Sequence, residues 1–259
     1  MAYALITGAA KGIGRAIASE MAAHNYNLIL IDMDMEGLVI VKDELNKKFP
    51  IDVQYFQIDL SEPEAIKQIL QFTIPFQQSL NIVINNAGYG LNGAFENILL
   101  DEQLNIIDVN IKAVVKICHG FIPLLKKFPK AYLLNVASTT AYQPVPYLNI
   151  YASTKAFILS FTRSLRYELR NTSISVSALS PGSTDTDFVK RARMGPAILK
   201  TADRFNMDAL VVAKIAVKGM LSGKTEIIPG FTNKINAYFP KFFPKKFIEK
   251  VAGKIYEPK

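Results

Sequence analysis

The sequence of 259 residues contains one cysteine, two histidines and no tryptophan. With only Cys118 present, no disulfide can form within the chain, and this scarcity is typical of proteins from reducing compartments. His24 and His119 do not belong to clusters of cysteines or carboxylates at the spacing of metal ligands, so we expect no metal site. These shortages exclude a scaffold held by internal disulfides and argue against a zinc protein.

Long apolar segments are also missing. No stretch approaches the roughly eighteen consecutive apolar residues of a transmembrane helix, so we expect none. A strand pattern begins at Tyr3, which leaves no room for the charged and apolar regions of a signal peptide. We therefore expect a cytoplasmic protein, and no nucleic-acid partner.

Apolar residues are abundant: they make up 50% of the chain, enough for a substantial core. Segments typical of buried strands alternate with helical segments, and no repeat, linker or change of composition divides residues 1–230. This alternation predicts an α/β fold in a single domain, a doubly wound parallel sheet with helices on both faces. The expected strands are 3–7, 27–32, 52–60, 80–88, 131–138, 173–179 and 225–228, and the expected helices are 15–24, 35–48, 61–73, 101–121, 151–170 and 208–221.

A glycine-rich turn, Gly8-Ala-Ala-Lys-Gly12-Ile-Gly14, separates the first strand from the first helix. Glycines let the backbone approach a pyrophosphate closely, and the unpaired N–H groups and dipole of the helix N-terminus favour its negative charge. Such a turn alone gives weak support for a dinucleotide site, but its place between a strand and a helix strengthens the interpretation.

The second strand ends in Asp32, about twenty residues after the glycines, where a carboxylate can bind the adenosine ribose. Asp32 could instead cap the helix at 35–48, since aspartate is common at that position, but its place at the strand end favours the ribose. After the third strand, Ser61 and Glu64 resemble a capping box for the next helix, with Pro63 in its first turn.

Polar or small residues follow most of the expected strands. In a doubly wound sheet, ligands bind beyond the carboxyl ends of the strands. The sequence therefore predicts a nucleotide site with reactive groups beside it. The residues concerned are Gly8–Gly14, Asp32, Asp59, 85–88, Ser138 and 181–186.

Tyr151 and Lys155 lie four residues apart, which places both side chains on one face of a helix. An adjacent ammonium group favours the phenolate and lowers the tyrosine pKa, which makes the pair suitable for acid–base chemistry. Such a pair alone is more often an exposed helix face. Asn110 lies among apolar neighbours in the helix at 101–121, so we expect it to be buried and to need a hydrogen-bond partner.

Together these motifs resemble those of the short-chain dehydrogenase/reductase family, whose members have a Rossmann-type fold. The likeness extends from about Tyr3 to Ile228, and its motifs occur in the family's order and spacing. They are Thr7-Gly8-x-x-x-Gly12-x-Gly14, Asp59-Leu60, Asn85-Asn86-Ala87-Gly88, Asn110, Ser138, Tyr151-x-x-x-Lys155 and Pro181-Gly182.

The resemblance implies an NAD(P)-dependent oxidoreductase that interconverts a secondary alcohol and a ketone. It implies that Tyr151 is the general acid/base, that Ser138 hydrogen-bonds the substrate oxygen, and that Lys155 holds the nicotinamide ribose and lowers the tyrosine pKa. Asn110 would position a water in a proton relay from Lys155. The cofactor-binding residues that it implies are Thr7, Gly8, Lys11, Gly12, Ile13, Gly14, Asp32, Asp59, Leu60, Asn86, Ala87, Gly88, Tyr151, Lys155, Pro181, Gly182, Thr184 and Thr186. The alternative is a non-catalytic dinucleotide-binding sensor or interaction protein on the same scaffold.

For the cofactor, we expect NAD, with NADP as the alternative. Asp32 would repel a 2′-phosphate, and Met33 stands where NADP-preferring relatives often have arginine. Lys11 favours NADP, because some NADP-dependent relatives bind the phosphate with a basic residue there. A carboxylate within hydrogen-bond distance disfavours a dianion more than a flexible lysine attracts it.

Residues 142–147 and 188–205 are expected to line the substrate pocket. Their Tyr, Pro, Val, Phe and Met residues suggest an apolar ketone, lipid-like or steroid-like. The basic residues of the second segment either meet an acidic end of the substrate or are simply solvated; they are Lys190, Arg191, Arg193 and Arg204.

Two further expectations concern association. Surplus apolar residues on the helices at 101–121 and 151–170 predict a homodimer or homotetramer, as the family resemblance does. Residues 231–259 form a basic, aromatic extension with seven lysines against two glutamates, and we expect it to be helical. Its apolar stripe either packs on the protein or makes peripheral contact with an anionic membrane; the stripe consists of Phe247, Ile248, Val251 and Ile255.

Overall fold

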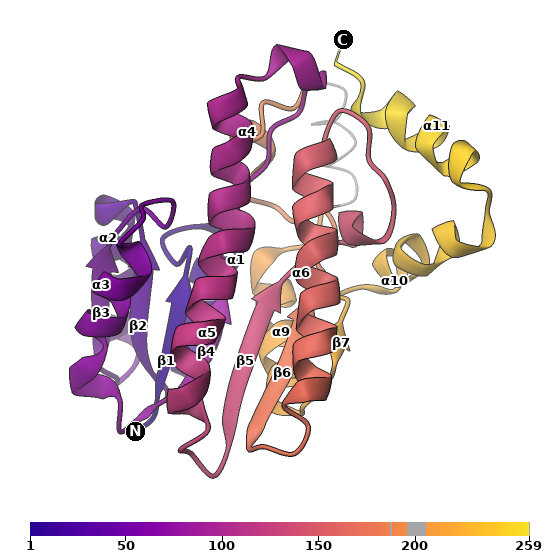
Figure 1. Cartoon of the computed structure of the whole chain (residues 1–259). Helices are drawn as coiled ribbons and strands as arrows, with labels where there is room; N and C mark the ends of the chain where they lie inside the picture. The colour runs from indigo at the N-terminus through magenta and orange to yellow at the C-terminus, as the bar shows by residue number, and fades with distance from the viewer. Residues whose placement is uncertain (187, 196–205, 259) are drawn as a thin grey trace.

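The computed structural model describes residues 1–186, 188–195 and 206–258, whose strands form one seven-stranded sheet (Figure 1). The strand order is β3-β2-β1-β4-β5-β6-β7, and all of the neighbouring strands pair in parallel. The order reverses between β1 and β4, which makes the edge beyond these strands the switch point where ligands bind. The strands are β1 Tyr3–Thr7, β2 Asn27–Asp32, β3 Val53–Gln57, β4 Leu80–Asn85, β5 Ala131–Val136, β6 Ile174–Leu179 and β7 Glu226–Ile227.

Two layers of helices cover this sheet, α1, α2 and α9 on one face and α3, α5 and α6 on the other, and α4 extends the second layer past the strand ends (Figure 1). Because both faces are covered, successive residues of a strand enter opposite cores: Ala4 and Ile6 pack with the first layer, and Leu5 packs with the second. This architecture confirms the predicted doubly wound α/β fold. The bounds are α1 Gly12–Ala23, α2 Met35–Lys48, α3 Ala65–Phe72, α4 Leu100–Ile107, α5 Val114–Leu125, α6 Asn149–Glu168, α7 Phe188–Arg191 and α9 Ala209–Leu221.

The helix after β3 starts later than predicted. It begins at Ala65, and Glu64 before it makes no side-chain cap. The backbone N–H and the hydroxyl of Ser61 both donate to Oδ1 of Asp59, at 2.9 and 2.8 Å. The predicted capping box is therefore wrong, because Asp59 holds Ser61 in a turn that precedes the helix.

Asn110 lies in a π-helical turn inside the long helix that the sequence predicted. α4 ends at Ile107, the π-helical segment covers Asp108–Ala113, and α5 continues from Val114. Such turns within helices are frequent at functional sites. The apolar pattern indicated one regular helix and gave no sign of this turn.

A buried polar cluster crosses the centre of the sheet. The Asn85 amide donates to Oδ1 of Asn135 at 2.8 Å and lies 3.4 Å from Sγ of Cys118. Nδ2 of Asn135 donates to the Thr162 hydroxyl at 3.0 Å, which joins β4, β5 and α6. Cys118 is 1% exposed, and burial raises the pKa of its thiol to about 12. The thiol is therefore an inert part of the core.

The chain after β7 forms an arm of helices at the side of the sheet, drawn in orange to yellow in Figure 1. The arm consists of α10 Phe231–Tyr238, the 3₁₀ turn η5 Phe239–Phe242 and α11 Lys245–Tyr256. Of the predicted stripe, Ile248 is buried, whereas Phe247, Val251 and Ile255 are exposed. The apolar residues of α11 are thus divided between two sides of the helix. None of the helices in the described ranges is both long enough and apolar enough to cross a membrane.

Candidate active site

The turn after β1 is shaped by its glycines. Gly8 and Gly12 adopt left-handed backbone conformations, with φ of +66° and +54°. A Cβ atom on Gly14 would lie 2.0 Å from the Gly8 carbonyl oxygen, so only glycine allows α1 to approach the turn this closely. Lys11 occupies the N-cap position of α1 without making a side-chain cap. The first N–H groups of α1 are therefore suited to bind an anion.

Thr7 and Asn86 tie this turn to the end of β4. Nδ2 of Asn86 donates to the carbonyl oxygens of Thr7 and Gly8, each at 3.0 Å. The backbone N–H groups of Asn86 and Ala87 donate to the Thr7 hydroxyl, each at 3.1 Å. These bonds fix the backbone of Asn86, Ala87 and Gly88 beside the glycine turn.

A cavity of about 780 Å³ opens beyond the carboxyl ends of the central strands. Of the residues predicted from the sequence, those that line it are Gly8, Lys11, Gly12, Ile13, Asp32, Asp59, Leu60, Asn86, Ala87, Gly88, Ser138, Tyr151, Lys155, Pro181, Gly182, Thr184 and Thr186. Thr7, Gly14 and Asn110 lie behind the lining and support it. The close glycine turn, the open N-terminus of α1 and the size of the cavity fit a dinucleotide.

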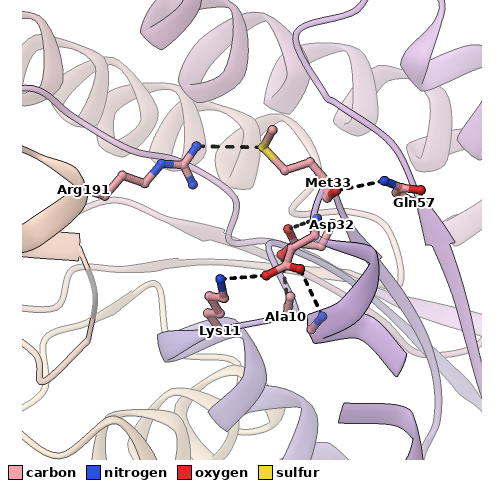
Figure 2. Close-up of polar contacts among 8 residues, drawn as sticks. Ala10, Lys11, Asp32, Met33, Gln57 and Arg191 are labelled. Atoms are coloured by element: carbon pink, nitrogen blue, oxygen red, sulfur yellow. Dashed lines mark hydrogen bonds and ion pairs between the residues drawn. The ribbon is translucent and has the colours of Figure 1, made fainter. Parts of the chain in front are cut away.

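Figure 2 shows the polar contacts at the carboxyl end of β2. Asp32 accepts hydrogen bonds from the Ala10 N–H at 3.0 Å through Oδ2 and from the Asp34 N–H at 3.1 Å through Oδ1. The N-cap of α2 is Asp34, whose Oδ1 accepts from the Gly37 N–H at 3.0 Å. The alternative role of Asp32 as a helix cap is therefore wrong, and its carboxylate lines the cavity.

Charged groups near the carboxyl end of β2 affect which cofactor the cavity would prefer. Nζ of Lys11 lies 2.7 Å from Oδ2 of Asp34. The hydrogen bond with Lys11, and then that with the Gly37 N–H, hold the pKa of the Asp34 carboxyl below its ordinary value. Arg191 reaches toward the same strand end from α7, and its Nη2 lies 3.9 Å from Sδ of Met33 (Figure 2).

Tyr151 and Lys155 lie one turn apart on α6; both are buried and line the cavity. Nζ of Lys155 donates to the Val136 carbonyl oxygen at 2.8 Å and lies 5.7 Å from the centre of the Tyr151 ring. A Cβ atom on Gly88 would lie 3.1 Å from Nζ of Lys155, and one on Gly90 would lie 2.7 Å from Cβ of Tyr151. These two glycines let the backbone after β4 pass directly against the pair.

Burial is the largest cause of the pKa shifts of Tyr151 and Lys155. It raises the pKa of Tyr151 to about 12, although a hydrogen bond with Ser138 acts to lower it. Burial also lowers the pKa of Lys155 to about 8. The predicted lowering of the tyrosine pKa is therefore wrong, because burial raises this pKa: removal from water disfavours the charged phenolate.

Asn110 supports the pair from behind and has the partners that its burial requires. Its Oδ1 accepts from the Tyr89 N–H at 3.0 Å, and its Nδ2 donates to the Tyr89 carbonyl oxygen and to Oγ1 of Thr154, each at 2.9 Å. The Thr154 hydroxyl in turn donates to the Tyr151 carbonyl oxygen at 2.7 Å. The π-helical turn thus connects the loop after β4 with the start of α6.

The walls of the cavity differ in part from the prediction. Within 188–195, the lining residues are Phe188, Val189, Arg191 and Met194, while 196–205, with Arg204, lie outside the described residues. The prediction that 142–147 line the cavity is wrong. Tyr142 hydrogen-bonds the Ser180 hydroxyl at 3.2 Å and the carboxylate of Glu226, and Val145 packs in the apolar cluster around Tyr151.

The sequence analysis missed four lining residues that the arm contributes: Asn233, Asn236, Ile255 and Tyr256. Tyr256 packs in the cluster around Tyr151, and burial raises the pKa of its phenol. Its carbonyl oxygen accepts from Nδ2 of Asn92 at 2.8 Å. Asn233 lies so close to Gly182 that a Cβ atom on this glycine would be 2.2 Å from its Oδ1. No motif marks these positions, and the aromatic character of the tail was the only signal for them.

Sequence comparison agrees with this geometry. The family model for short chain dehydrogenases matches residues 2–196, which include the glycine turn and the Tyr151–Lys155 pair. The chain belongs to the short-chain dehydrogenase family. This dehydrogenase is 30% identical to mouse 17-beta-hydroxysteroid dehydrogenase type 3 over 236 residues, which cover 90% of the chain and 76% of the mouse protein.

Solved structures of the family share the fold of this dehydrogenase. A short-chain dehydrogenase from Sphingobium yanoikuyae in complex with NADPH has a TM-score of 0.82 at 23% identity, covering 100% of this chain and 96% of that one. A short-chain dehydrogenase/reductase from Burkholderia phymatum in complex with NAD has a TM-score of 0.84 at 21% identity, covering 93% of each. At these identities the likeness shows the common fold.

Proposed function

We propose that this dehydrogenase uses a nicotinamide dinucleotide to interconvert a secondary alcohol and a ketone. The proposal depends on one observation: Tyr151, Lys155 and Ser138 line the same cavity as the glycine turn and Asp32. Groups suited to bind a dinucleotide and groups suited to transfer a proton thus line one cavity. The NADPH and NAD complexes of the related folds support this class of cofactor.

The chain's own residues would hold the cofactor along the cavity. The glycine turn and the N-terminus of α1 would bind the pyrophosphate, Asp32 the adenosine ribose, and Lys155 the nicotinamide ribose. Thr184 and Thr186, which line the cavity, would meet the carboxamide and phosphates. Asp59 and Leu60, which also line it, would contact the adenine. When bound, the cofactor supplies or accepts the hydride.

Tyr151 is the proposed acid–base group. In the direction of reduction, its O–H bond breaks and the proton moves to the carbonyl oxygen; in oxidation, the phenolate takes the proton of the substrate hydroxyl. With a pKa raised to about 12, Tyr151 is protonated at neutral pH, which suits donation to a ketone. Ser138 would donate a hydrogen bond to the same oxygen.

The carboxylates at the end of β2 support a preference for NAD(H). Asp32 would face a 2′-phosphate directly, and Lys11 is already paired with Asp34 at 2.7 Å. A 2′-phosphate would have to compete with Asp34 for Lys11 while it lies next to Asp32. Arg191, which contacts Met33 after the end of β2, carries a positive charge that would favour the 2′-phosphate of NADP(H).

Apolar side chains around Tyr151 support an apolar substrate, lipid-like or steroid-like. Leu148, Phe188, Met194 and Tyr256 line the cavity at this end, and the rings of Phe188 and Tyr151 are 5.1 Å apart. The likeness to a hydroxysteroid dehydrogenase agrees with a bulky apolar ketone.

A homo-oligomer is also proposed, with α4, α5 and α6 as its interface. α4 and α5 follow one another in one long helix, and α6 runs beside it (Figure 1). Leu100, Leu104 and Phe157 are exposed on them, and the ring of Phe157 stacks on Phe161 at 5.9 Å. An apolar surface of this kind is suited to contact with a second copy.

Replacement of Tyr151 tests the proposed chemistry. Tyr151→Phe keeps the ring and removes the transferable proton, so turnover should fall by about a thousandfold while NAD(H) still binds, as measured by fluorescence titration. Tyr167→Phe, at an exposed position of α6, is the control and should leave both quantities unchanged. Full turnover in Tyr151→Phe would refute the assignment. Tight NADH binding without turnover across a broad carbonyl panel would favour the non-catalytic alternative.

A further inference from the structure

The C-terminal arm exposes a series of large apolar side chains. From Phe231 to Val251, every fourth residue is apolar and exposed. The ring centres of Phe239 and Phe243 are 4.3 Å apart, and those of Phe243 and Phe247 are 5.9 Å apart. Phe242 is 82% exposed and Phe231 is 79% exposed. We call this surface the outer face; it consists of Phe231, Ile235, Phe239, Phe242, Phe243, Phe247 and Val251.

The arm does not need this outer face to hold its position. Near its start, the Tyr238 hydroxyl donates to Glu226 at 3.0 Å, and near its end the Tyr256 carbonyl oxygen accepts from Asn92 at 2.8 Å. Between these two anchors, Ile248 and Ala252 of α11 are buried against the protein. Contiguous apolar surface that internal packing does not use marks an interaction site.

The arm that carries the outer face is positively charged. Residues 231–259 contain seven lysines against Glu249 and Glu257. The described exposed lysines of the arm are Lys234, Lys245, Lys246, Lys250 and Lys254. Phenylalanines between lysines are the combination that binds at the boundary of headgroups and acyl chains in an anionic membrane.

We propose that the outer face docks this dehydrogenase on an anionic lipid surface, with the phenylalanines inserted between headgroups and the lysines against anionic phosphates. A second copy of the chain suits the face less well. A two-fold symmetric contact would bring the same lysines of both copies together, and like charges facing each other oppose association.

The docking surface lies next to the candidate active site. Asn233 and Asn236 of α10, and Ile255 and Tyr256 of α11, line the cavity, so the arm separates the cavity from the proposed lipid surface. Docking would bring the cavity close to a bilayer in which apolar ketones dissolve. This consequence rests on the proposed function, whereas lipid binding itself does not.

Co-sedimentation of the full chain with vesicles tests the proposal without any assay of activity. We expect binding to phosphatidylcholine vesicles that contain roughly 30% phosphatidylserine, and at least about tenfold weaker binding to phosphatidylcholine alone or in about 0.5 M NaCl. The double replacement Phe242→Ser with Phe247→Ser should weaken binding at least about tenfold, and Lys246→Glu with Lys250→Glu should do the same. All four side chains are exposed, so the fold should persist by circular dichroism.

Matched controls change the same residue types elsewhere. Phe95, which is 53% exposed, gives the control Phe95→Ser, and Lys47→Glu with Lys214→Glu imposes the same charge change on α2 and α9. Both controls should bind vesicles like the unmodified protein. Equal losses in the controls, or no binding of the unmodified protein to phosphatidylserine vesicles, would overturn the proposal. If light scattering then shows that Phe242→Ser with Phe247→Ser dissociates an oligomer, the face is a contact between copies.

Discussion

Lys155 allows a quantitative prediction because its ammonium group is buried in the folded protein. Burial lowers the pKa of Lys155 from 10.5 to about 8. The difference of about 2.5 pH units (10.5 − 8) corresponds to about 3 kcal/mol, since each unit is worth about 1.4 kcal/mol. At neutral pH the folded protein therefore contains a charge that destabilises it by about 3 kcal/mol relative to the neutral form.

The replacement Lys155→Met keeps a side chain of similar length and removes this charge. It also removes the 2.8 Å hydrogen bond from Nζ to the Val136 carbonyl oxygen, whose loss costs about 1–2 kcal/mol. The variant should therefore be more stable than the unmodified protein by about 2 kcal/mol at neutral pH, as measured by urea denaturation. Its turnover should be lost, because Lys155 is proposed to hold the nicotinamide ribose.

This stability difference should depend on pH in one direction. Between about pH 8 and 10.5, the unfolded chain keeps a proton on Lys155 that the folded protein has released, so the unmodified protein gains stability as the pH rises. The advantage of the variant should shrink by about 1.4 kcal/mol per pH unit and vanish near about pH 9.5. Lys214→Met, at an exposed position of α9, should show no such trend. A variant less stable than the unmodified protein at neutral pH, or a difference that does not change with pH, would refute the reasoning.

Two other predictions concern the cofactor and the assembly. Asp32→Ala should reduce the ratio of kcat/KM for NAD(H) over NADP(H) by about tenfold, because it removes the carboxylate that repels a 2′-phosphate; a native preference for NADP(H) would show that Lys11 or Arg191 governs the choice. Phe157→Glu should dissociate the proposed oligomer, because it forces a carboxylate into an apolar contact. If light scattering gives one mass for the variant and the unmodified protein, α6 is not the interface.

The fold and the polar edge of the sheet could be predicted because both follow from local patterns. Strands covered on both faces are nearly continuous apolar runs, as in 27–32 and 131–136, and helices separate them at regular intervals. Parallel topology then gathers the residues after each strand at one edge. For this reason Asp32, Ser138 and the glycine turn, which are far apart in the sequence, line one cavity.

Other features depend on contacts between distant segments, which no local pattern reveals. The spacing of Ser61 and Glu64 was misleading because Asp59 takes both donors of Ser61. The spacing of Tyr151 and Lys155 indicated a shared helix face but not their burial, and burial sets both pKa values. Tyr256 reaches the cavity only because α11 folds back over the loops around Asn92.

The position of Cys118 makes the native thiol a reporter of core motion. Cys118 is enclosed beside the Asn85–Asn135 pair, and a thiol with a pKa of about 12 is almost entirely protonated in the folded state. An alkylating reagent can therefore modify it only during openings of the central sheet. Because the chain has no second cysteine, the labelling rate under native conditions measures the frequency of those openings without an engineered probe or a competing site.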